Sequence, residues 1–254
     1  MTAATLHSDP DAAQVRLQAW RSRRPRPEEW SALEAILGFD EFLIHARQPP
    51  FARWLEGVGT DPALHEIDRG MRAACRRDCE LMAAWYAPQW QRPLARLAGI
   101  IELPLLGPLL RGESAAPWVL DDPLWHSIVE SDPAQRSRLA TGFDLGAAGT
   151  EDLFARWVQA WLAGLPPGSK ALADGFAHVS RAVFAQRTAT ATNARERAKP
   201  VASLSERLAP LFRRNAGSPL AMVCEFVAVV LDLQRLRSGL VRRALARRAA
   251  TVPA

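Results

Sequence analysis

Helical periodicity interrupted by proline is the feature that most constrains this chain. Apolar residues recur every three or four positions in one stretch after another, and no stretch keeps the two-residue alternation of a β-strand. The 19 prolines and 15 glycines divide these patterns, because proline cannot continue most helices. The sequence therefore predicts an all-α, multi-helical fold of short-to-medium helices in repeated units, arranged as a curved stack.

Several helix boundaries can be placed from the residues that start and end helices. A helix over 28–37 is predicted to end at Gly38, and Pro93 is predicted to open another. An aspartate followed by proline favours a helix start, because the carboxylate accepts hydrogen bonds from free amides and proline loses none there. Such starts are Asp61-Pro62, before an amphipathic helix of about six turns, and Asp122-Pro123 and Asp132-Pro133. The last helix is predicted from Ser218-Pro219 to about Arg248.

The same breaks suggest a domain organisation. Residues 1–27 are polar and proline-rich, and we expect an N-terminal arm or a loosely docked helix. Residues 28–254 are predicted to form a single all-helical domain, with subdivisions near 113 and within 187–200, the second of which has a linker-like composition.

The net charge of +5 is unevenly distributed. Residues 1–112 are neutral, residues 113–186 sum to −4, and residues 187–254 carry 13 basic and 4 acidic groups. An acidic partner or an anionic surface would therefore meet the last quarter, where Arg242 and Arg243 are candidate contacts. A basic nucleic-acid-binding or scaffold module is one interpretation, although no helix-turn-helix signature is present.

No catalytic motif is present, and no cofactor or metal is expected. Cys75 and Cys79 share a helix face, but His65 lies too far away to complete a metal site, so buried inert thiols are favoured. Glu225 and Asp232 are interpreted as a solvated stripe or as partners of nearby arginines rather than as an acid–base pair. An all-α enzyme with a site assembled from distant residues stays open as a further alternative.

Compartment and tryptophan usage add two expectations. The start of the chain lacks a basic leader and an apolar segment, and the broken apolar run 100–110 is too short to span a membrane, which favours a cytoplasmic setting. Tryptophans at helical spacing are predicted to lie in the core, namely Trp85, Trp157 and Trp161. Those near breaks are predicted to form contact surfaces, namely Trp20, Trp30 and Trp90.

Several stretches together resemble a known family. They are G-F-D-E-F-L at 38–43, P-P-F-x-x-W-L at 49–55, the helix starting near Leu64, L-x-G-I-I-E-L-P-L-L-G-P-L-L-R-G at 97–112, Asp122 to Trp125, and D-L-Q-R-L-R at 232–237. This combination resembles the family of central-stalk socket subunits of V/A-type rotary ATPases.

The resemblance implies a non-catalytic, funnel-like socket that links the central shaft to the membrane ring and transmits torque for ion transport or ATP synthesis. The partners would be the shaft subunits and the ring, with no small-molecule substrate, and the protein would be peripheral on the cytoplasmic face of the membrane. The candidate partner-binding residues are Trp90, Arg111, Asp232, Arg235, Arg237, Arg242 and Arg243.

Overall fold

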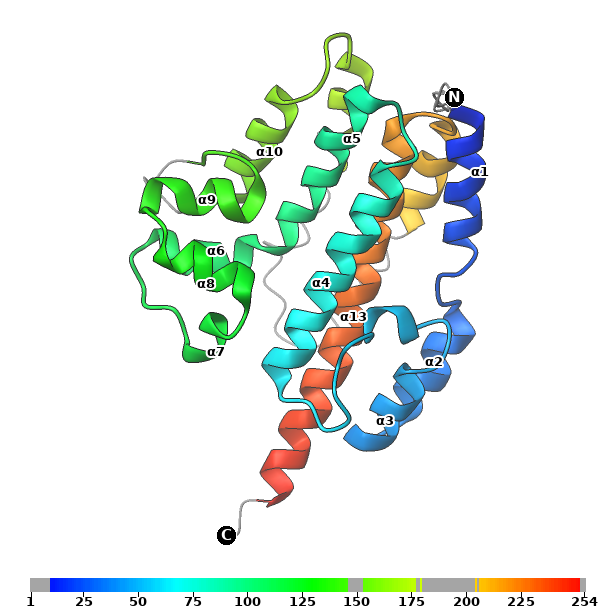
Figure 1. Cartoon of the computed structure of the whole chain (residues 1–254). Helices are drawn as coiled ribbons and strands as arrows, with labels where there is room; N and C mark the ends of the chain where they lie inside the picture. Colours follow the sequence, from blue (N-terminus) through cyan, green and yellow to red (C-terminus); the bar gives the residue numbers. More distant parts are fainter. Residues whose placement is uncertain (1–9, 146–152, 177–178, 180–203, 205, 252–254) are drawn as a thin grey trace, which may run out of the picture.

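The computed structural model describes residues 10–145, 153–176, 179, 204 and 206–251 (Figure 1). Every regular element in these ranges is a helix, which confirms the all-α, multi-helical fold. The elements are α1 (Pro10–Arg21), α2 (Pro27–Ala35), α3 (Phe39–Ala46), η1 (Ala52–Trp54), α4 (Leu64–Ala83), α5 (Pro88–Ala95), η2 (Arg96–Ile101), α6 (Leu103–Leu110), α7 (Pro117–Leu120), α8 (Pro123–Glu130), α9 (Pro133–Thr141), α10 (Leu153–Ala163) and α13 (Pro219–Thr251). Residues 170–176 and 206–214 are also helical.

Two long helices, α4 and α13, form the centre of the fold and run antiparallel side by side (Figure 1). The apolar stripe of α4 faces inward, with Ile67, Met71 and Cys75 at most 4% exposed. Phe226 and Leu240 of α13 are equally buried. Fully burying a large apolar side chain stabilises the fold by roughly 1.5–3 kcal/mol, so this pair is the main core. The predicted start of the last helix at Pro219 is confirmed.

The N-terminal segment packs against this core. Leu17 is fully buried and Trp20 is 9% exposed, and α1 contacts α13. The side-chain oxygen of Gln14 accepts a hydrogen bond at 2.8 Å from the backbone nitrogen of Gly217, next to the start of α13. Of the two expectations for this segment, an arm or a docked helix, the structure therefore shows a docked helix over residues 10–21.

A second group of helices, α5 to α10, lies on the other side of α4 (Figure 1). Pro93, predicted to open a helix, lies instead inside α5, which begins at Pro88. The backbone oxygen of Pro93 accepts a hydrogen bond at 2.8 Å from the indole of Trp161 in α10. Leu97 of η2, where this group packs against α4, is only 2% exposed.

The Asp-Pro starts have different outcomes. Asp122 caps α8 as predicted, because its Oδ1 accepts a hydrogen bond at 3.1 Å from the backbone of Leu124. The predicted cap at Asp61 is wrong. Here α4 starts later, and the carboxylate of Glu66 reaches back to the backbone nitrogen of Ala63 at 2.7 Å. Asp61 instead pairs with an arginine of α13.

The end of α2 also differs from the prediction. The helix ends at Ala35, leaving Leu37 87% exposed, and Gly38 precedes α3 as its N-cap rather than closing α2. Arg243 of α13 explains the early end, because its guanidinium donates to the carbonyl oxygens of Glu34 and Ile36 at 2.9 and 2.7 Å. Those carbonyls are satisfied from outside the helix, so the chain can leave it there.

Within the described ranges, no single helix is both long and apolar enough to cross a membrane. One pair of consecutive segments, Pro88–Ile101 and Leu103–Leu110, is together long and apolar enough for a membrane span, but the pair is bent by 69° at the break between them.

Candidate functional site

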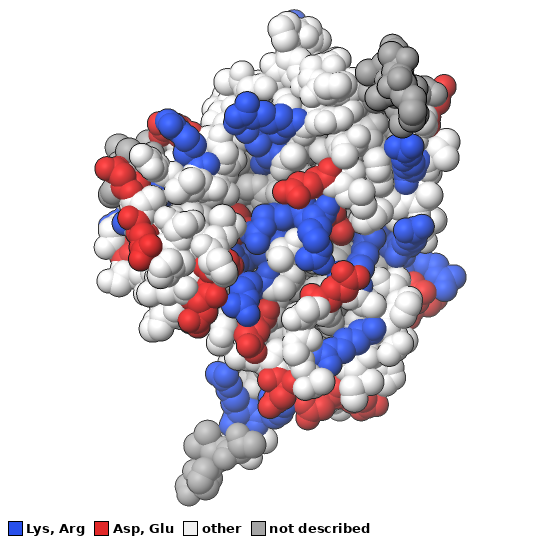
Figure 2. Space-filling model, in the orientation of Figure 1, with Lys and Arg blue, Asp and Glu red and all other residues white. Residues whose placement is uncertain are grey.

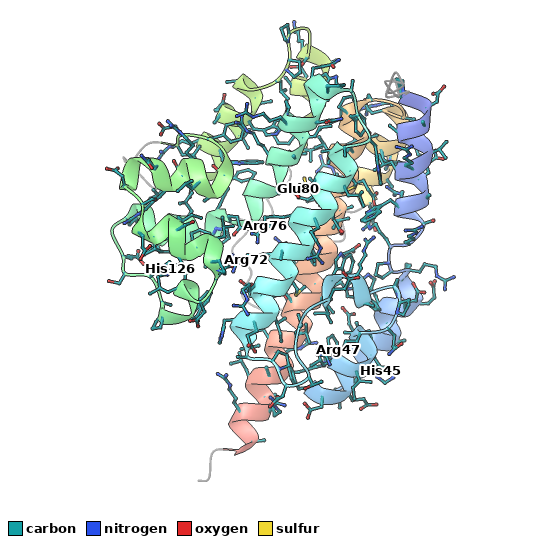
Figure 3. The ribbon with its side chains drawn as sticks, viewed as in Figure 1. His45, Arg47, Arg72, Arg76, Glu80 and His126 are labelled. Carbon is teal, nitrogen blue, oxygen red and sulfur yellow. The ribbon has the colours of Figure 1, made fainter. Side chains whose placement is uncertain are left out.

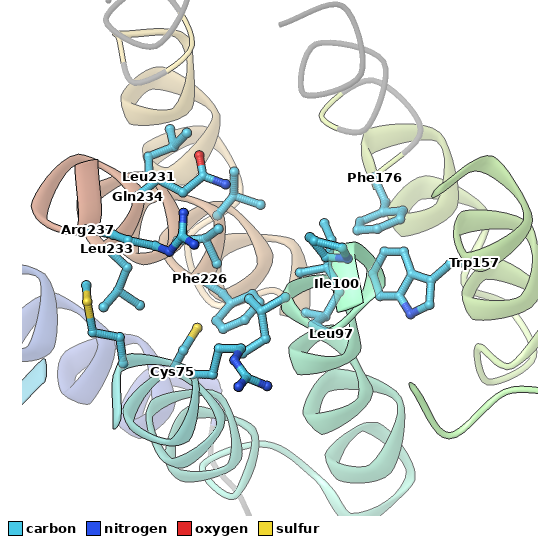
Figure 4. A pocket seen from close by; sticks show the side chains of 16 residues that line it. Cys75, Leu97, Ile100, Trp157, Phe176, Phe226, Leu231, Leu233, Gln234 and Arg237 are labelled. Carbon is cyan, nitrogen blue, oxygen red and sulfur yellow. The ribbon is translucent and has the colours of Figure 1, made fainter. Parts of the chain in front are cut away.

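A cavity of about 270 Å³ lies where the central helices meet the second group (Figure 4). It is bordered by α4 and α13 on one side and by η2, α10 and the helix over 170–176 on the other. Its apolar walls are formed by Met71, Leu97, Ile100, Ile101, Pro104, Trp157, Phe176, Phe226, Val227, Val230, Leu231 and Leu233. Three polar side chains complete the lining, namely Arg72, Gln234 and Arg237, together with the thiol of Cys75.

The spacing of residues along α13 places its contribution on one face. Phe226, Val230 and Arg237 are four and seven residues apart, so their side chains project from the same side of the helix. Across the cavity, the rings of Trp157 and Phe176 are 6.4 Å apart between centroids. Two aromatic side chains from separate helices therefore form one wall, and Arg237, the arginine that α13 contributes to the lining, lies on the other side of the cavity (Figure 4).

Hydrogen-bond donors gather where Arg237 and Gln234 border the cavity. Nε of Arg237 donates to Oδ1 of Asp68 at 2.5 Å, which fixes the direction of the side chain while leaving it 54% exposed. Among the described residues, the terminal nitrogens of Arg237 and the amide of Gln234 have no hydrogen-bond partner. The rim thus presents solvent-exposed donors, not engaged by other described side chains, next to apolar walls.

Arg72, the other cationic side chain of the lining, is held by a buried acid. Glu102 is fully buried and accepts from Nη1 of Arg72 at 2.9 Å and from the indole of Trp125 at 3.1 Å. Its other oxygen accepts from Arg76. Arg72 and Arg76 lie one turn apart on α4 (Figure 3). Arg72 also donates to Asp68 at 3.0 Å. These bonds join α4, η2, α6 and α8 into one block and fix the cavity wall.

The thiol of Cys75 is the one group of the lining with nucleophilic chemistry. It is 1% exposed, and burial raises its pKa well above the usual range. A thiolate, not a thiol, is the reactive form. The prediction that Cys75 and Cys79 are buried is confirmed, and both are free.

A second buried charge cluster lies where α1 meets α13. Oε2 of Glu225 accepts from Arg21 at 3.2 Å, and Oδ2 of Asp232 accepts from Arg24 at 2.7 Å. Burial outweighs these arginines and raises the pKa of Glu225 to about 7. The predicted pairing with arginines is confirmed, but the predicted solvation is wrong, because the two carboxylates are 0% and 8% exposed. Their partners come from the opposite end of the sequence.

Two tryptophans expected at a contact surface are instead part of the core. Trp20 and Trp30 are 9% and 3% exposed. The guanidinium of Arg53 lies 4.6 Å from the Trp20 ring, and Trp30 packs edge-on against Phe51 with 4.8 Å between centroids. Trp90 is half-buried. A tryptophan next to a proline-rich break is therefore not necessarily at the surface, because Trp20 and Trp30 both pack in the core.

Three of the six arginines of α13 bind acids from the first third of the chain. Those that do so are Arg235 with Glu34, Arg237 with Asp68, and Arg247 with Asp40 and Asp61. Arg243 is buried and lies 3.9 Å from the ring of Phe42, which differs from the surface role expected for it. Arg111 pairs with Glu113 at 2.6 Å, and Arg242 is exposed. Folding thus pairs part of the basic charge of this helix with acids from distant segments.

Comparisons with known proteins give no relative. No protein-family model matches the chain, and no curated protein and no solved structure matches it. In the described part, no group of three or more His, Cys, Asp or Glu side chains is placed to hold a metal ion. What the molecule binds is therefore inferred from its own geometry.

The cavity itself could not be predicted from the sequence, although Arg237 is one of the candidate contact residues. A local feature of α13 could have indicated the cavity. Gln234 and Arg237 interrupt a face of α13 that is otherwise apolar, and both sit beside Leu233. Polar side chains bordering an apolar stripe are what the rim of a ligand cavity requires.

Proposed function

We propose that this protein binds a small amphipathic molecule, with its apolar body in the cavity and an oxygen-bearing end at Arg237. The observation that carries the proposal is the combination of apolar walls with terminal guanidinium nitrogens of Arg237 that no other described side chain binds. Ligand sites typically have this composition, and volumes of roughly 300–1,000 Å³ are usual. The cavity, at about 270 Å³, lies just below that range and therefore suits a small ligand.

The charges around the rim favour an end that accepts hydrogen bonds. Arg237 shares Asp68 with Arg72, and Arg72 also binds Glu102, so the network already contains acids as well as bases. The terminal nitrogens of Arg237 are still directed donors, and a guanidinium pairs well with a carboxylate. A carboxylate is therefore the best fit, and an alcohol of the same chain length is the weaker one.

Binding is proposed rather than catalysis because of which groups the lining contains. It includes no aspartate, glutamate or histidine among the described residues, and its one thiol is protonated by burial. General acid–base chemistry needs a titratable group within reach of the substrate. The polar groups here are donors that can orient a ligand.

Isothermal titration with decanoate and decan-1-ol tests the proposal. We expect saturable binding of decanoate to the wild-type protein and weaker binding of the alcohol. Ile100→Trp places a larger side chain in the cavity and should reduce decanoate affinity at least tenfold. Ile44→Trp is the matched control, because Ile44 is 61% exposed on α3.

Circular dichroism of both variants confirms that they fold. Two results would overturn the proposal. One is an absence of saturable binding of either probe to the wild-type protein, and the other is decanoate binding by Ile100→Trp that equals binding by Ile44→Trp.

The socket function implied by the sequence resemblance is a second candidate. The end of α13 supports it, because this end extends beyond the body of the molecule and carries the exposed Arg242 and Leu245 (Figure 1). A tagged protein isolated from native membranes in mild detergent should then carry rotary-ATPase shaft and ring subunits, and Arg242→Glu with Leu245→Glu should release them. Isolation without those subunits would remove this candidate.

A further inference from the structure

A second pocket, separate from the amphipathic cavity, lies where α4, α5, η2 and the end of α9 meet. We propose that it binds a phosphate group. Its volume is about 260 Å³, and its lining includes three arginines, namely Arg76, Arg92 and Arg96. Figure 2 shows basic side chains gathering on this face of the molecule, over α4 and α5. The proposal does not depend on the function proposed for the cavity.

Arg92 and Arg96 are positioned for one shared ligand. They are four residues apart along α5 and the start of η2, so they project from the same side. Within the described part of the chain, neither guanidinium has an acidic partner. Like charges at this spacing repel each other, and burial, together with the charge of Arg92, lowers the pKa of Arg96. A bound anion would relieve that repulsion.

The guanidinium of Arg96 is held in place without a ligand. It lies 4.7 Å from the centroid of the Phe143 ring. It also lies against Gly142, whose φ is +77°, and a Cβ at that glycine would be 3.0 Å from Nε of Arg96. The close approach and the ring together fix a planar donor that faces the pocket. Pre-organised donors of this kind lose less conformational entropy on binding an anion.

The third arginine, Arg76, has only part of its guanidinium in hydrogen bonds. Nη1 of Arg76 donates to the buried Glu102, which leaves the rest of its guanidinium at the pocket. Glu80 is the one exposed acid of the lining, one helical turn beyond Arg76 on α4 (Figure 3). Three arginines with two acids give the site a positive balance, and Glu80 is the group that opposes an anion.

Phosphate fits this arrangement better than a monovalent carboxylate. Guanidinium groups donate pairs of hydrogen bonds that match phosphate oxygens. Two arginines that have no acidic partner in the described part of the chain can balance a dianion. The phosphate can belong to a small soluble molecule or to a lipid headgroup, and both sources share this chemistry.

The test measures phosphate binding by the full-length protein at constant ionic strength maintained with chloride. Inorganic phosphate is titrated calorimetrically, and flotation is measured with vesicles of phosphatidylcholine containing phosphatidic acid. Saturable binding of phosphate alone supports a soluble ligand, and binding to the vesicles as well supports a lipid headgroup. An absence of both overturns the proposal.

Variants distinguish phosphate binding at this pocket from nonspecific attraction to the basic surface of the protein. Arg92→Ala and Arg96→Ala should each weaken phosphate binding at least tenfold, while Arg96→Lys should weaken it less than Arg96→Ala. Glu80→Gln should strengthen it several-fold. Arg242→Ala removes the same charge from an exposed position on α13 and should bind phosphate as the wild type does.

Arg92 is exposed on α5, so its substitution should not affect folding. Circular dichroism checks this for each variant. If folded Arg92→Ala binds phosphate as tightly as Arg242→Ala, the assignment of this pocket is wrong.

Discussion

Glu102 and Arg72 form a buried ion pair, 2.9 Å between Oε2 and Nη1, at the wall between the amphipathic cavity and the phosphate pocket. Arg72 lines the first and Glu102 the second. Because Glu102 also accepts a hydrogen bond from Arg76, one carboxylate fixes an arginine on each side. The two sites therefore share a structural element, although they present different surfaces.

Glu102→Gln should destabilise the fold. The substitution keeps the shape but leaves two guanidinium groups without their main counter-charge, and breaking a buried pair typically costs about 3–5 kcal/mol. The free energy of unfolding in urea should fall by about 3 kcal/mol. Glu113→Gln is the control, because its pair with Arg111 is half-exposed and such pairs contribute less than about 1 kcal/mol. Equal stability of the two variants would contradict the role given to Glu102.

Stability should depend on pH through Glu225. Burial raises the pKa of this carboxyl to about 7 in the folded protein, so the folded state holds the proton more tightly than the unfolded state does. Its contribution is present below the unfolded pKa and is lost as pH rises through 7. A change of that size corresponds to at most about 3 kcal/mol.

Urea unfolding at pH 5, 6 and 7 measures this dependence. The wild-type free energy of unfolding should decrease over that range, and Glu225→Gln should show a smaller decrease. Glu56→Gln, at an exposed position, should keep the wild-type slope. Parallel slopes for the wild type and Glu225→Gln would rule out this carboxyl as the source.

The sequence was sufficient where local chemistry decides the structure. Asp122 is followed by proline, and its own carboxylate caps the helix that follows, so the start of α8 could be predicted. Two carboxylates near the start of α4, those of Asp61 and Glu66, could accept from its first backbone amides. Glu66 does so, and Asp61 binds Arg247 of α13 instead. That outcome depends on a residue 186 positions away, which no local pattern contains.

Both sites are built from contacts between residues that lie far apart in the sequence. Glu225 is paired with Arg21 across 204 positions, so burial of the carboxylate could not be inferred from α13 alone. A cavity is likewise a property of how several elements approach one another. The helical spacing of Trp157 and Phe176 predicts that both face inward, but nothing in their own helices says that space is left between them and α13.

Leu17→Ala should test whether α1 is an integral part of the fold. Leu17 is fully buried, and a leucine-to-alanine change in a core costs about 2–5 kcal/mol. Val15→Ala, at a position that is 64% exposed on the same helix, should cost less than about 0.5 kcal/mol. The measurement is the urea midpoint of each variant. If Leu17→Ala were as stable as Val15→Ala, α1 would behave as an arm rather than as a docked helix.

The three cysteines should resist alkylation in the native protein. All are buried, and burial raises the pKa of each thiol, that of Cys224 to about 12. Because the thiolate is the reactive species, iodoacetamide at pH 8 should modify the folded protein slowly and the urea-unfolded protein at all three positions. Mass spectrometry of the two samples reads out the difference. Rapid labelling of Cys75 in the native state would show that its thiol is accessible and ionised, and would reopen a nucleophilic role for the cavity.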